Sequence, residues 1–358
     1  MDKVTLITIF FYTSLILPIF GVFFIQYSKN PKLEKYFLQY FSYGFVLFVF
    51  SVIAFRPIGD FGFPDTKMYT YWFNQSKINN TIATKDIGFG IFTFILSKLV
   101  SLKLFFVICT AFSFGLLFWL SRKIAGNYWF LFFLGTMVSL YFWNQHVFTI
   151  RQGLASVIFL TALFQRKVAF TFILFLISIS FHKSFLLPFF CYLIIYFFKK
   201  TRIFISIWLI SIPVSYYLGN EIVNFFSDSF SSDVAFYFPP ESLENSNNTF
   251  RWDVVFYSLI FIIIPFLYKF KDKIYIDVVN LYILVNSIII ILLWPASIYI
   301  HRFAYLSWFL APVILYYPLL KHKKIDIFSL YSKVLLSFYI MIVFYIGIKL
   351  FQQDFRFI

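Results

Sequence analysis

Arginine and histidine side chains stand at the ends of apolar runs, where they are suited to binding a phosphorylated ligand. Arg151 and Gln152 open one run, and His182 and Lys183 follow another. An arginine can hold two phosphate oxygens at once, and a histidine can donate a hydrogen bond or act as a base. We therefore expect Arg151 and His182 to be catalytic. Gln152 and Lys183 would contact the substrate, although long basic side chains also extend to lipid headgroups without any other role.

A second polar group lies between Arg56 and Tyr69 and contains two carboxylates, Asp60 and Asp65. A carboxylate beside an arginine can orient or deprotonate a hydroxyl group while the arginine holds an anion. This arrangement makes the two carboxylates alternative catalytic residues and predicts substrate contacts for Arg56 and Tyr69. The alternative interpretation is a solvated loop with a local ion pair that contributes little to stability.

Three further candidates for substrate binding, Arg251, His301 and Arg302, stand at the starts of later apolar runs. One aromatic residue separates Arg251 from Asp253, so a local ion pair is the alternative interpretation there. Arg302 lies inside its apolar run, and we therefore expect its side chain to point into the protein.

The composition excludes a soluble globular protein. The chain has 358 residues, of which 61% are hydrophobic and only 13% charged, whereas charged residues make up ~25% of a soluble domain. Because bilayer-length apolar runs recur from end to end, we expect an all-α polytopic integral membrane protein with a single membrane domain over residues 1–358. The net charge of +15 comes from short basic clusters between these runs, which argues against a nucleic-acid partner.

The positions of the basic clusters predict how the chain crosses the membrane. Lysine and arginine gather on the cytoplasmic side of membrane proteins, and they cluster here at 29–35, 122–123, 166–167, 199–202, 269–273 and 321–324. All of these clusters become cytoplasmic if about 12 helices cross the membrane and both termini lie outside. This topology requires 87–100 to be a re-entrant or interfacial helix, and it makes the polar stretches 56–86 and 220–251 external loops.

The predicted spans are residues 5–27, 37–55, 103–121, 128–147, 152–164, 168–181, 184–198, 203–219, 252–268, 275–295, 299–319 and 327–350. Two consecutive runs, 152–164 and 168–181, are shorter than the ~20 residues that cross a hydrocarbon core. We expect them to form a helical hairpin with the basic cluster 166–167 at its tip. Arg151 and His182 would then lie together at its open end.

This topology collects on the external face the polar residues that the positive-inside rule does not explain. They are Arg56, Asp60, Asp65, Tyr69, His146, Arg151, His182, Arg251, Asp253, His301 and Arg302. Arginines at external span ends run against the usual bias in basic residues. Their convergence predicts an anion-binding site at the outer leaflet.

Several common catalytic motifs are absent from the sequence. It contains no P-loop, no GxSxG nucleophile elbow and no acidic pair with metal-ligand spacing. Cys109 and Cys191 lie within apolar runs, where we expect them to be packing residues. We therefore expect no metal and no cofactor, so arginines would have to stabilise a phosphorylated leaving group.

Five short elements of the sequence carry a resemblance to a known family. They are Arg56 with Asp65-Thr-Lys-Met-Tyr69, Gly88-Phe-Gly90-Ile-Phe, Ile150-Arg-Gln-Gly-Leu-Ala155, Phe181-His-Lys-Ser184 and Arg302. Together they resemble the EpsG-like branch of the Wzy polysaccharide polymerases, over about residues 50–310. The chain departs from the family after its first arginine, where members carry a more compact Gly-Asp-Tyr-type step. Asp60 and Asp65 are therefore both candidates for the family's carboxylate.

The resemblance implies a glycosyltransferase of the bacterial inner membrane, with its site facing the periplasm. It would join oligosaccharide repeat units, carried on undecaprenyl diphosphate, into O-antigen, capsule or exopolysaccharide. Arg151 and Arg302 would bind the diphosphate, and Arg56 the diphosphate or a sugar. His182 would be a base or a phosphate contact, and the 220–251 loop would help to hold sugar.

The partners implied by the resemblance are the lipid-linked donor and acceptor, the lipid bilayer and a chain-length regulator. Two alternative functions stay open. One is an O-antigen ligase, or another glycosyltransferase of the GT-C type that uses lipid-linked sugars. The other is a flippase for lipid-linked oligosaccharides, which would need charged residues throughout the bundle interior rather than on one face.

Overall fold

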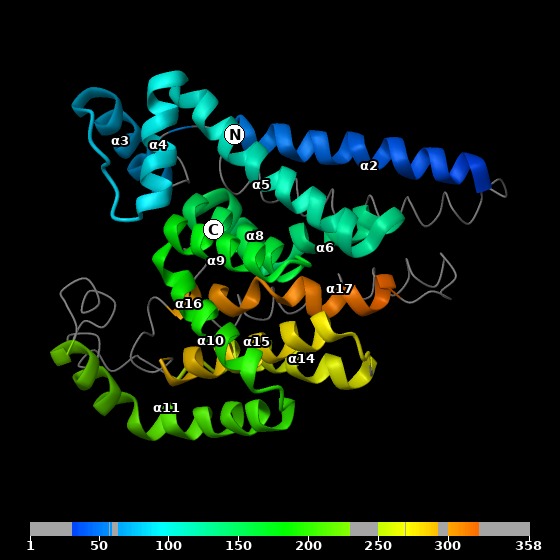
Figure 1. The fold of residues 1–358 in the computed structure, drawn as a ribbon, viewed down its shortest axis with the longest axis vertical. Helices are drawn as coiled ribbons and strands as arrows, with labels where there is room; N and C mark the ends of the chain where they lie inside the picture. The colour runs from blue at the N-terminus through cyan, green and yellow to red at the C-terminus, as the bar shows by residue number, and fades with distance from the viewer. Residues whose placement is uncertain are drawn as a thin grey trace. The chain divides into compact units, whose positions relative to one another are not determined.

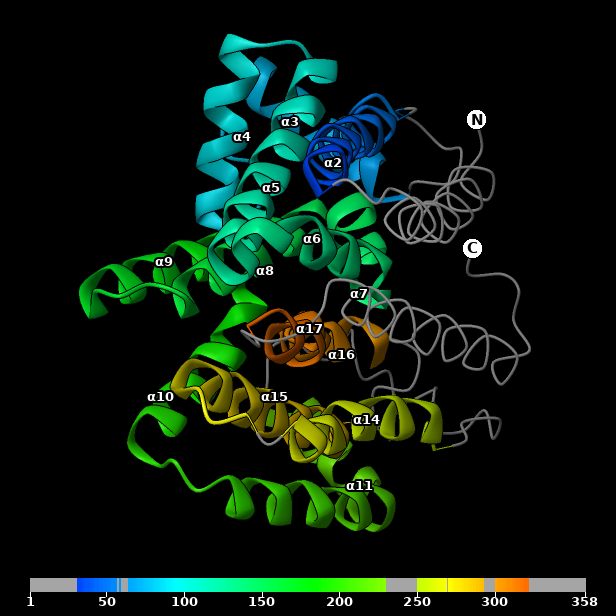
Figure 2. The ribbon, with the colours of Figure 1, turned by 90° about the vertical axis from the view of Figure 1, so that its right-hand side faces the viewer.

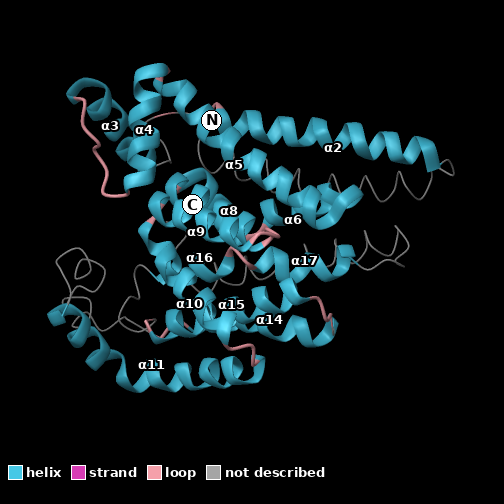
Figure 3. Cartoon of the chain, viewed as in Figure 1, coloured by secondary structure: helices cyan, strands magenta, loops and turns pink. Residues whose placement is uncertain are grey.

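The computed structural model describes residues 31–56, 58, 64–229, 250–268, 270–292 and 300–321. Every regular element in these ranges is a helix (Figure 3), which confirms the all-helical prediction. Four helical stretches in these ranges are long and apolar enough to cross a membrane: Leu102–Met137, Thr201–Gly219, Lys273–Ile291 and Arg302–Lys321. The number of spans and the side on which the termini lie stay predictions, and the expected spans 5–27 and 327–350 lie outside the described residues.

The chain divides into two compact units, which are residues 1–185 with 316–358 and residues 186–315. The helices of the first unit are α2 (Pro31–Ala54), α3 (Pro64–Asn79), α4 (Ile87–Leu99), α5 (Leu102–Ala125), the 3₁₀ turn η1 (Gly126–Tyr128), α6 (Trp129–Val138), α7 (Leu140–Phe142), the π-helix η2 (Trp143–Phe148), α8 (Ile150–Leu163), α9 (Val168–Phe181) and the 3₁₀ turn η3 (Lys183–Phe185). Those of the second unit are α10 (Leu186–Phe197), α11 (Thr201–Ser229), α14 (Trp252–Tyr268), α15 (Lys273–Ile291) and α16 (Ile300–Trp308). The last described helix, α17 (Ala311–Lys321), crosses the boundary between the units.

Helices α8 and α9 form the predicted hairpin. Phe159 and Phe175 pack with ring centroids 4.4 Å apart, and Ser178 Oγ donates a hydrogen bond of 2.7 Å to the Ala155 carbonyl. The partner in α8 moves back from residue 159 to 155 while the partner in α9 moves forward from 175 to 178, so the two helices are antiparallel. The basic tip, residues 166–167, is exposed, so Arg151 and His182 belong to the open end.

The first turn of α8 depends on a glycine. A Cβ on Gly153 would lie 2.7 Å from the carbonyl carbon of Gln145 and 2.9 Å from Cα of His146. Any side chain there would push the π-helix η2 away from α8, because real Cβ atoms do not approach backbone so closely. This close packing gives a physical reason for the glycine of the Arg-Gln-Gly-Leu-Ala element.

A second close approach joins α4 to α9. A Cβ on Gly88 would lie 2.8 Å from Cβ of Ser180, so the start of α4 rests directly on the last turn of α9. The ring of Phe89 is fully buried and packs against Tyr69 of α3 and Phe181 of α9, at 5.7 and 6.3 Å between centroids. Helices α3, α4 and α9 therefore meet at the open end of the hairpin, and α4 lies beside α3 in Figure 1.

The structure corrects four expected boundaries. The stretch 56–86 is not wholly a loop, since α3 lies within it, and residues 220–229 of the expected loop 220–251 are the end of α11. The run 128–147 is divided, because α6 ends at Val138 and is followed by α7 and then η2. The run 299–319 is also divided, into α16 and α17. The remaining residues of the second loop, 230–249, lie outside the described part of the chain.

The second unit is built around α15, which contacts α10, α11, α14 and α16. Figure 2 shows α14 beside α15. The buried amide of Asn286 accepts a hydrogen bond of 2.7 Å from Trp208 Nε1 and donates to Ser258 Oγ and Ser307 Oγ at 2.9 and 3.1 Å. One side chain therefore ties α15 to α11, α14 and α16, as buried polar groups commonly do between membrane helices.

Candidate functional site

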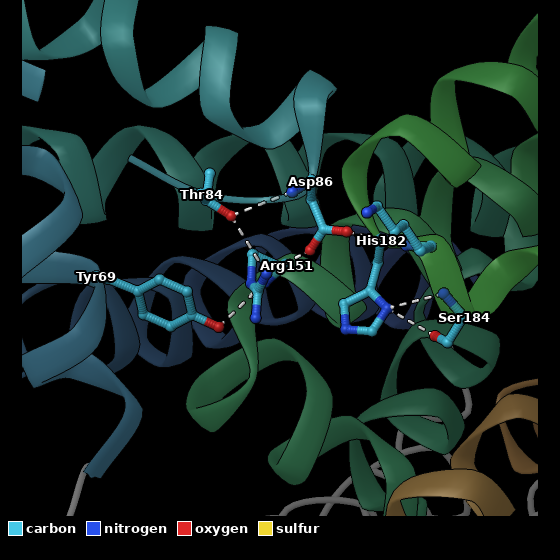
Figure 4. A network of polar contacts seen from close by, with 7 residues as sticks. Tyr69, Thr84, Asp86, Arg151, His182 and Ser184 are labelled. Carbon is cyan, nitrogen blue, oxygen red and sulfur yellow. Dashed lines mark hydrogen bonds and ion pairs between the residues drawn. The ribbon is translucent and has the colours of Figure 1, made fainter. Parts of the chain in front are cut away.

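Arg151, in the first turn of α8, lies in a network of contacts at the open end of the hairpin (Figure 4). Its guanidinium forms an ion pair with Asp86, and NH1 also donates to Thr84 Oγ1 at 3.5 Å. The guanidinium carbon lies 4.5 Å from the centroid of the Trp72 ring, a cation–π contact. The backbone N–H of Arg151 donates to the Tyr69 hydroxyl at 3.4 Å. Arg151 is therefore held on several sides and has its charge compensated.

Asp86 is a member of the site that sequence reasoning missed. Its residue is 5% exposed, and Oδ1 accepts the backbone N–H of Lys183 at 3.2 Å while Oδ2 pairs with Arg151. The only signal in the sequence is an aspartate directly before the apolar run of α4, which is typical of a residue preceding a helix. Nothing in that pattern predicts contacts with Arg151 and Lys183, 65 and 97 residues away.

His182 follows the last residue of α9 and is half-buried. Its Nδ1 accepts the backbone N–H of Ser184 at 3.3 Å and lies 2.6 Å from Ser184 Oγ. A backbone N–H can only donate, so Nδ1 must be the unprotonated nitrogen. The neutral ring then carries its proton on Nε2, and the geometry suits His182 to donating a hydrogen bond from that atom.

Arg56, just beyond the end of α2, is a buried cation without a carboxylate partner among the described residues. It is 4% exposed, NH1 donates to the Ile53 carbonyl at 3.0 Å, and the guanidinium carbon lies 5.1 Å from the Phe106 ring centroid. Nε and NH2 are buried and form no hydrogen bond with any described group. Burial lowers the pKa of Arg56 to about 10, while the neighbouring Cys109 and Tyr69 act in the opposite direction. The guanidinium is therefore still charged at neutral pH.

Tyr69 lies between the two arginines. It is 1% exposed, its hydroxyl accepts from the Arg151 backbone, and it interacts electrostatically with Arg56. Burial raises the pKa of Tyr69 to about 12, so the phenol is neutral and able to donate a hydrogen bond. Asp65 lies one turn earlier on the same face of α3 and is half-buried. The structure therefore brings Arg56, Asp65, Tyr69 and Arg151 to one region.

The other predicted residues of the first unit differ in how deeply they are buried. Gln152 is buried in α8 at 5% exposure, and the Lys183 side chain is exposed although its backbone binds Asp86. His146 is also buried, with Nδ1 2.6 Å from Ser113 Oγ, which places it in the core of the first unit rather than on a surface. Asp60 lies outside the described residues.

The three candidates of the second unit do not all match expectation. Arg251 forms the local two-point ion pair with Asp253, with Nε–Oδ1 and NH2–Oδ2 distances of 2.8 and 2.7 Å, and its role in substrate binding stays a prediction. The prediction that Arg302 points into the protein is wrong, because its residue is exposed.

His301 belongs to α16, and its side chain lies outside the described atoms. The predicted convergence of the second unit's arginines with Arg151 stays a prediction. Among the described residues, no group of three or more His, Cys, Asp or Glu side chains is arranged to hold a metal ion. Cys109 and Cys191 are free and buried, as expected for packing residues.

Comparison with known proteins identifies the family. No curated protein and no solved structure matches the chain. The family model described as the EpsG family matches residues 45–355, a range that holds every element on which the resemblance rests. The chain belongs to the EpsG family, which is a family of EpsG-like polysaccharide polymerases.

Proposed function

We propose that the protein polymerises oligosaccharide repeat units carried on undecaprenyl diphosphate, at the outer leaflet of the bacterial inner membrane. The growing chain is the donor, and a hydroxyl group on the terminal sugar of a new lipid-linked unit is the acceptor. The product is O-antigen, capsule or exopolysaccharide. Membership of the EpsG family supports the class of reaction. The observation that carries the site is the buried charge of Arg56, which no carboxylate among the described residues compensates.

A buried cation without a counter-ion costs several kcal/mol, so a protein keeps one where a ligand supplies the negative charge. The nitrogens of Arg56 that form no hydrogen bond with any described group are Nε and NH2. These two atoms make one edge of the guanidinium, the edge that binds two oxygens of a phosphate in parallel. We assign Arg56 to the diphosphate of the donor, and Arg151, which Asp86 already compensates, to a secondary contact.

The reaction transfers the glycan from one oxygen to another. The acceptor hydroxyl oxygen bonds to the anomeric carbon of the donor, and the bond from that carbon to the diphosphate oxygen breaks. The hydroxyl proton passes to a carboxylate, for which Asp65 is the described candidate and Asp60 the alternative. The lipid diphosphate leaves as an anion, stabilised by Arg56 and by a hydrogen bond from Nε2 of His182. The guanidinium groups supply the positive charge, so the proposed reaction needs no metal.

The remaining candidate residues have accessory roles in this proposal. Tyr69, whose hydroxyl accepts the Arg151 N–H, and Gln152 would contact the substrate, and Lys183 would add positive charge. Arg251, His301 and Arg302 stay candidates for contact with sugar or diphosphate. A chain-length regulator is the proposed protein partner.

The test is a gel analysis of surface glycan from cells that lack the protein and carry a plasmid copy of it. Wild type should restore a ladder of long chains. Arg56→Ala should give single repeat units only, and Arg56→Lys, which keeps the charge but loses the two-point contact, should reduce long chains by about 100-fold. Arg166→Ala, at the exposed cytoplasmic tip of the hairpin, is the matched control and should behave as wild type.

Each contrary pattern of glycan in the cells lacking the protein points to a different function. Polymer that accumulates on undecaprenyl diphosphate and never reaches its final acceptor would indicate a ligase. The absence of any repeat unit outside the membrane would indicate a flippase. A normal ladder from Arg56→Ala, at normal protein level, would remove Arg56 from the mechanism.

A further inference from the structure

Asp86 is the point at which three segments distant in sequence are joined. It directly precedes α4, its Oδ2 pairs with Arg151 at the start of α8, and its Oδ1 accepts the backbone N–H of Lys183 after α9. Its side chain is 8% exposed, so both oxygens face protein groups rather than water. Figure 4 shows the Asp86 carboxylate between Arg151 and the turn that carries His182.

We propose that Asp86 is a positioning residue, whose carboxylate fixes the Arg151 guanidinium relative to the turn of His182 and Ser184. The inference rests on the proposed function, because it concerns the geometry of the same site. It assigns to Asp86 no contact with substrate. Asp65 or Asp60 keeps the role of proton acceptor, and Arg56 remains the principal ligand of the diphosphate.

The surroundings of Asp86 are rigid, as a positioning role requires. Its backbone N–H donates to Thr84 Oγ1 at 3.3 Å, and the same hydroxyl accepts from Arg151 NH1. Two residues further on, Gly88 packs directly on Ser180 of α9. The carboxylate is thus anchored to the same helix whose end it binds, and a small displacement would be transmitted to both Arg151 and His182. Misplacement of a catalytic group by about 1 Å can reduce a rate by about 100-fold.

The charge of Asp86 gives the positioning role a distinct kinetic signature. The Asp86 carboxylate offsets the charge of Arg151, whereas Arg56 pairs with no carboxylate among the described residues. Asp86→Asn removes that offset, which should favour binding of an anionic donor and lower its KM or leave it unchanged. The same change releases Arg151 and the His182 turn from their fixed positions, which should lower kcat by about 10- to 100-fold.

The experiment measures kcat and KM for repeat units on undecaprenyl diphosphate, with purified protein in proteoliposomes. The variants are Asp86→Asn, Asp86→Glu, Arg151→Lys and the double variant Asp86→Asn/Arg151→Lys. The control is Asp272→Asn, because Asp272 belongs to the second unit, also precedes a helix, α15, and accepts the Tyr275 N–H at 3.1 Å. Rates are expressed per folded protein, measured by size-exclusion chromatography.

We expect kcat to fall in Asp86→Asn with KM not raised, Asp86→Glu to recover part of the loss, and Asp272→Asn to match wild type. The double variant should be no slower than the slower single variant, because the two residues act as one unit. A wild-type kcat in Asp86→Asn, a raised KM, or losses that multiply in the double variant would each overturn the positioning role.

The positioning role of Asp86 can still be tested if the protein turns out not to be a polymerase. If wild-type protein makes no polymer from intact substrate, the function is refuted, and thermal unfolding of the same four variants then decides the inference. Equal lowering of Tm by Asp86→Asn, Arg151→Lys and the double variant would show that the pair fixes the turn. Additive lowering would overturn it.

Discussion

At the scale of single residues, the site contains two arginines that differ in whether their charge is compensated. Arg151 pairs with Asp86 and lies over Trp72, whereas Arg56 is buried with two nitrogens that form no hydrogen bond to any described group. The sequence predicted both as site residues, since an arginine at the end of an apolar run is costly. It could not rank them, because compensation of Arg151 depends on a carboxylate 65 residues earlier in the chain.

His182 provides a residue-scale prediction, since the Ser184 N–H requires Nδ1 to be an acceptor. If Nε2 donates a hydrogen bond in the reaction, His182→Gln should retain more activity than His182→Asn. The glutamine amide N–H can reach the position of Nε2, whereas the asparagine amide reaches only that of Nδ1. We expect a loss of about 100-fold for His182→Asn and a smaller loss for His182→Gln, measured as initial rates of chain extension. Equal, complete loss in both variants would instead favour His182 as a base.

At the scale of elements, the hairpin of α8 and α9 was predictable because two short apolar runs flank a basic tip. The division of 128–147 into α6, α7 and the π-helix η2 was not, because neither Gly nor Pro stands at the break after Val138. The break depends on tertiary packing, since η2 fits against α8 at Gly153. π-Helices occur often at functional sites, and this one leads directly to Arg151.

The packing at Gly153 gives an element-scale prediction. Gly153→Ala should destabilise the protein by about 1–3 kcal/mol and reduce activity, because the added Cβ meets the backbone of η2. Gly115→Ala in the middle of α5 is the matched control, since a Cβ there meets nothing within 4 Å. That change should be neutral or stabilise by up to about 1 kcal/mol. Thermal unfolding in detergent measures both, and equal Tm values for the two variants would contradict the close packing.

At the scale of the whole molecule, the predicted topology depends on whether α4 crosses the membrane. The Lys98 ammonium group, near the end of α4, donates to the Lys77 carbonyl at 2.9 Å and to Asn80, at the end of α3. Helix α3 is polar and is not among the helices apolar enough to cross a membrane. The end of α4 thus lies beside the end of a helix that we expect to be external, which supports a re-entrant or interfacial α4.

Cysteine labelling tests this topology. Single cysteines at Thr81, Ser101 and Lys167, all exposed positions, would be treated with a membrane-impermeant maleimide in intact cells. We expect Thr81→Cys and Ser101→Cys to react, because they flank an α4 that does not span, and Lys167→Cys to react only after permeabilisation. Reaction of Ser101→Cys only after permeabilisation would show that α4 spans the membrane and would invert the topology of everything after it.

The most direct test of the proposed function uses purified protein in proteoliposomes with repeat units on undecaprenyl diphosphate as the only substrate. Glycan length and free undecaprenyl diphosphate would be measured together, in the presence of EDTA. We predict a ladder from wild type and from Arg166→Ala, with lipid diphosphate released in step with the linkages formed, and almost none from Arg56→Lys. Release of lipid diphosphate without a ladder, or an equal ladder from Arg56→Lys, would contradict polymerisation at an arginine-stabilised diphosphate.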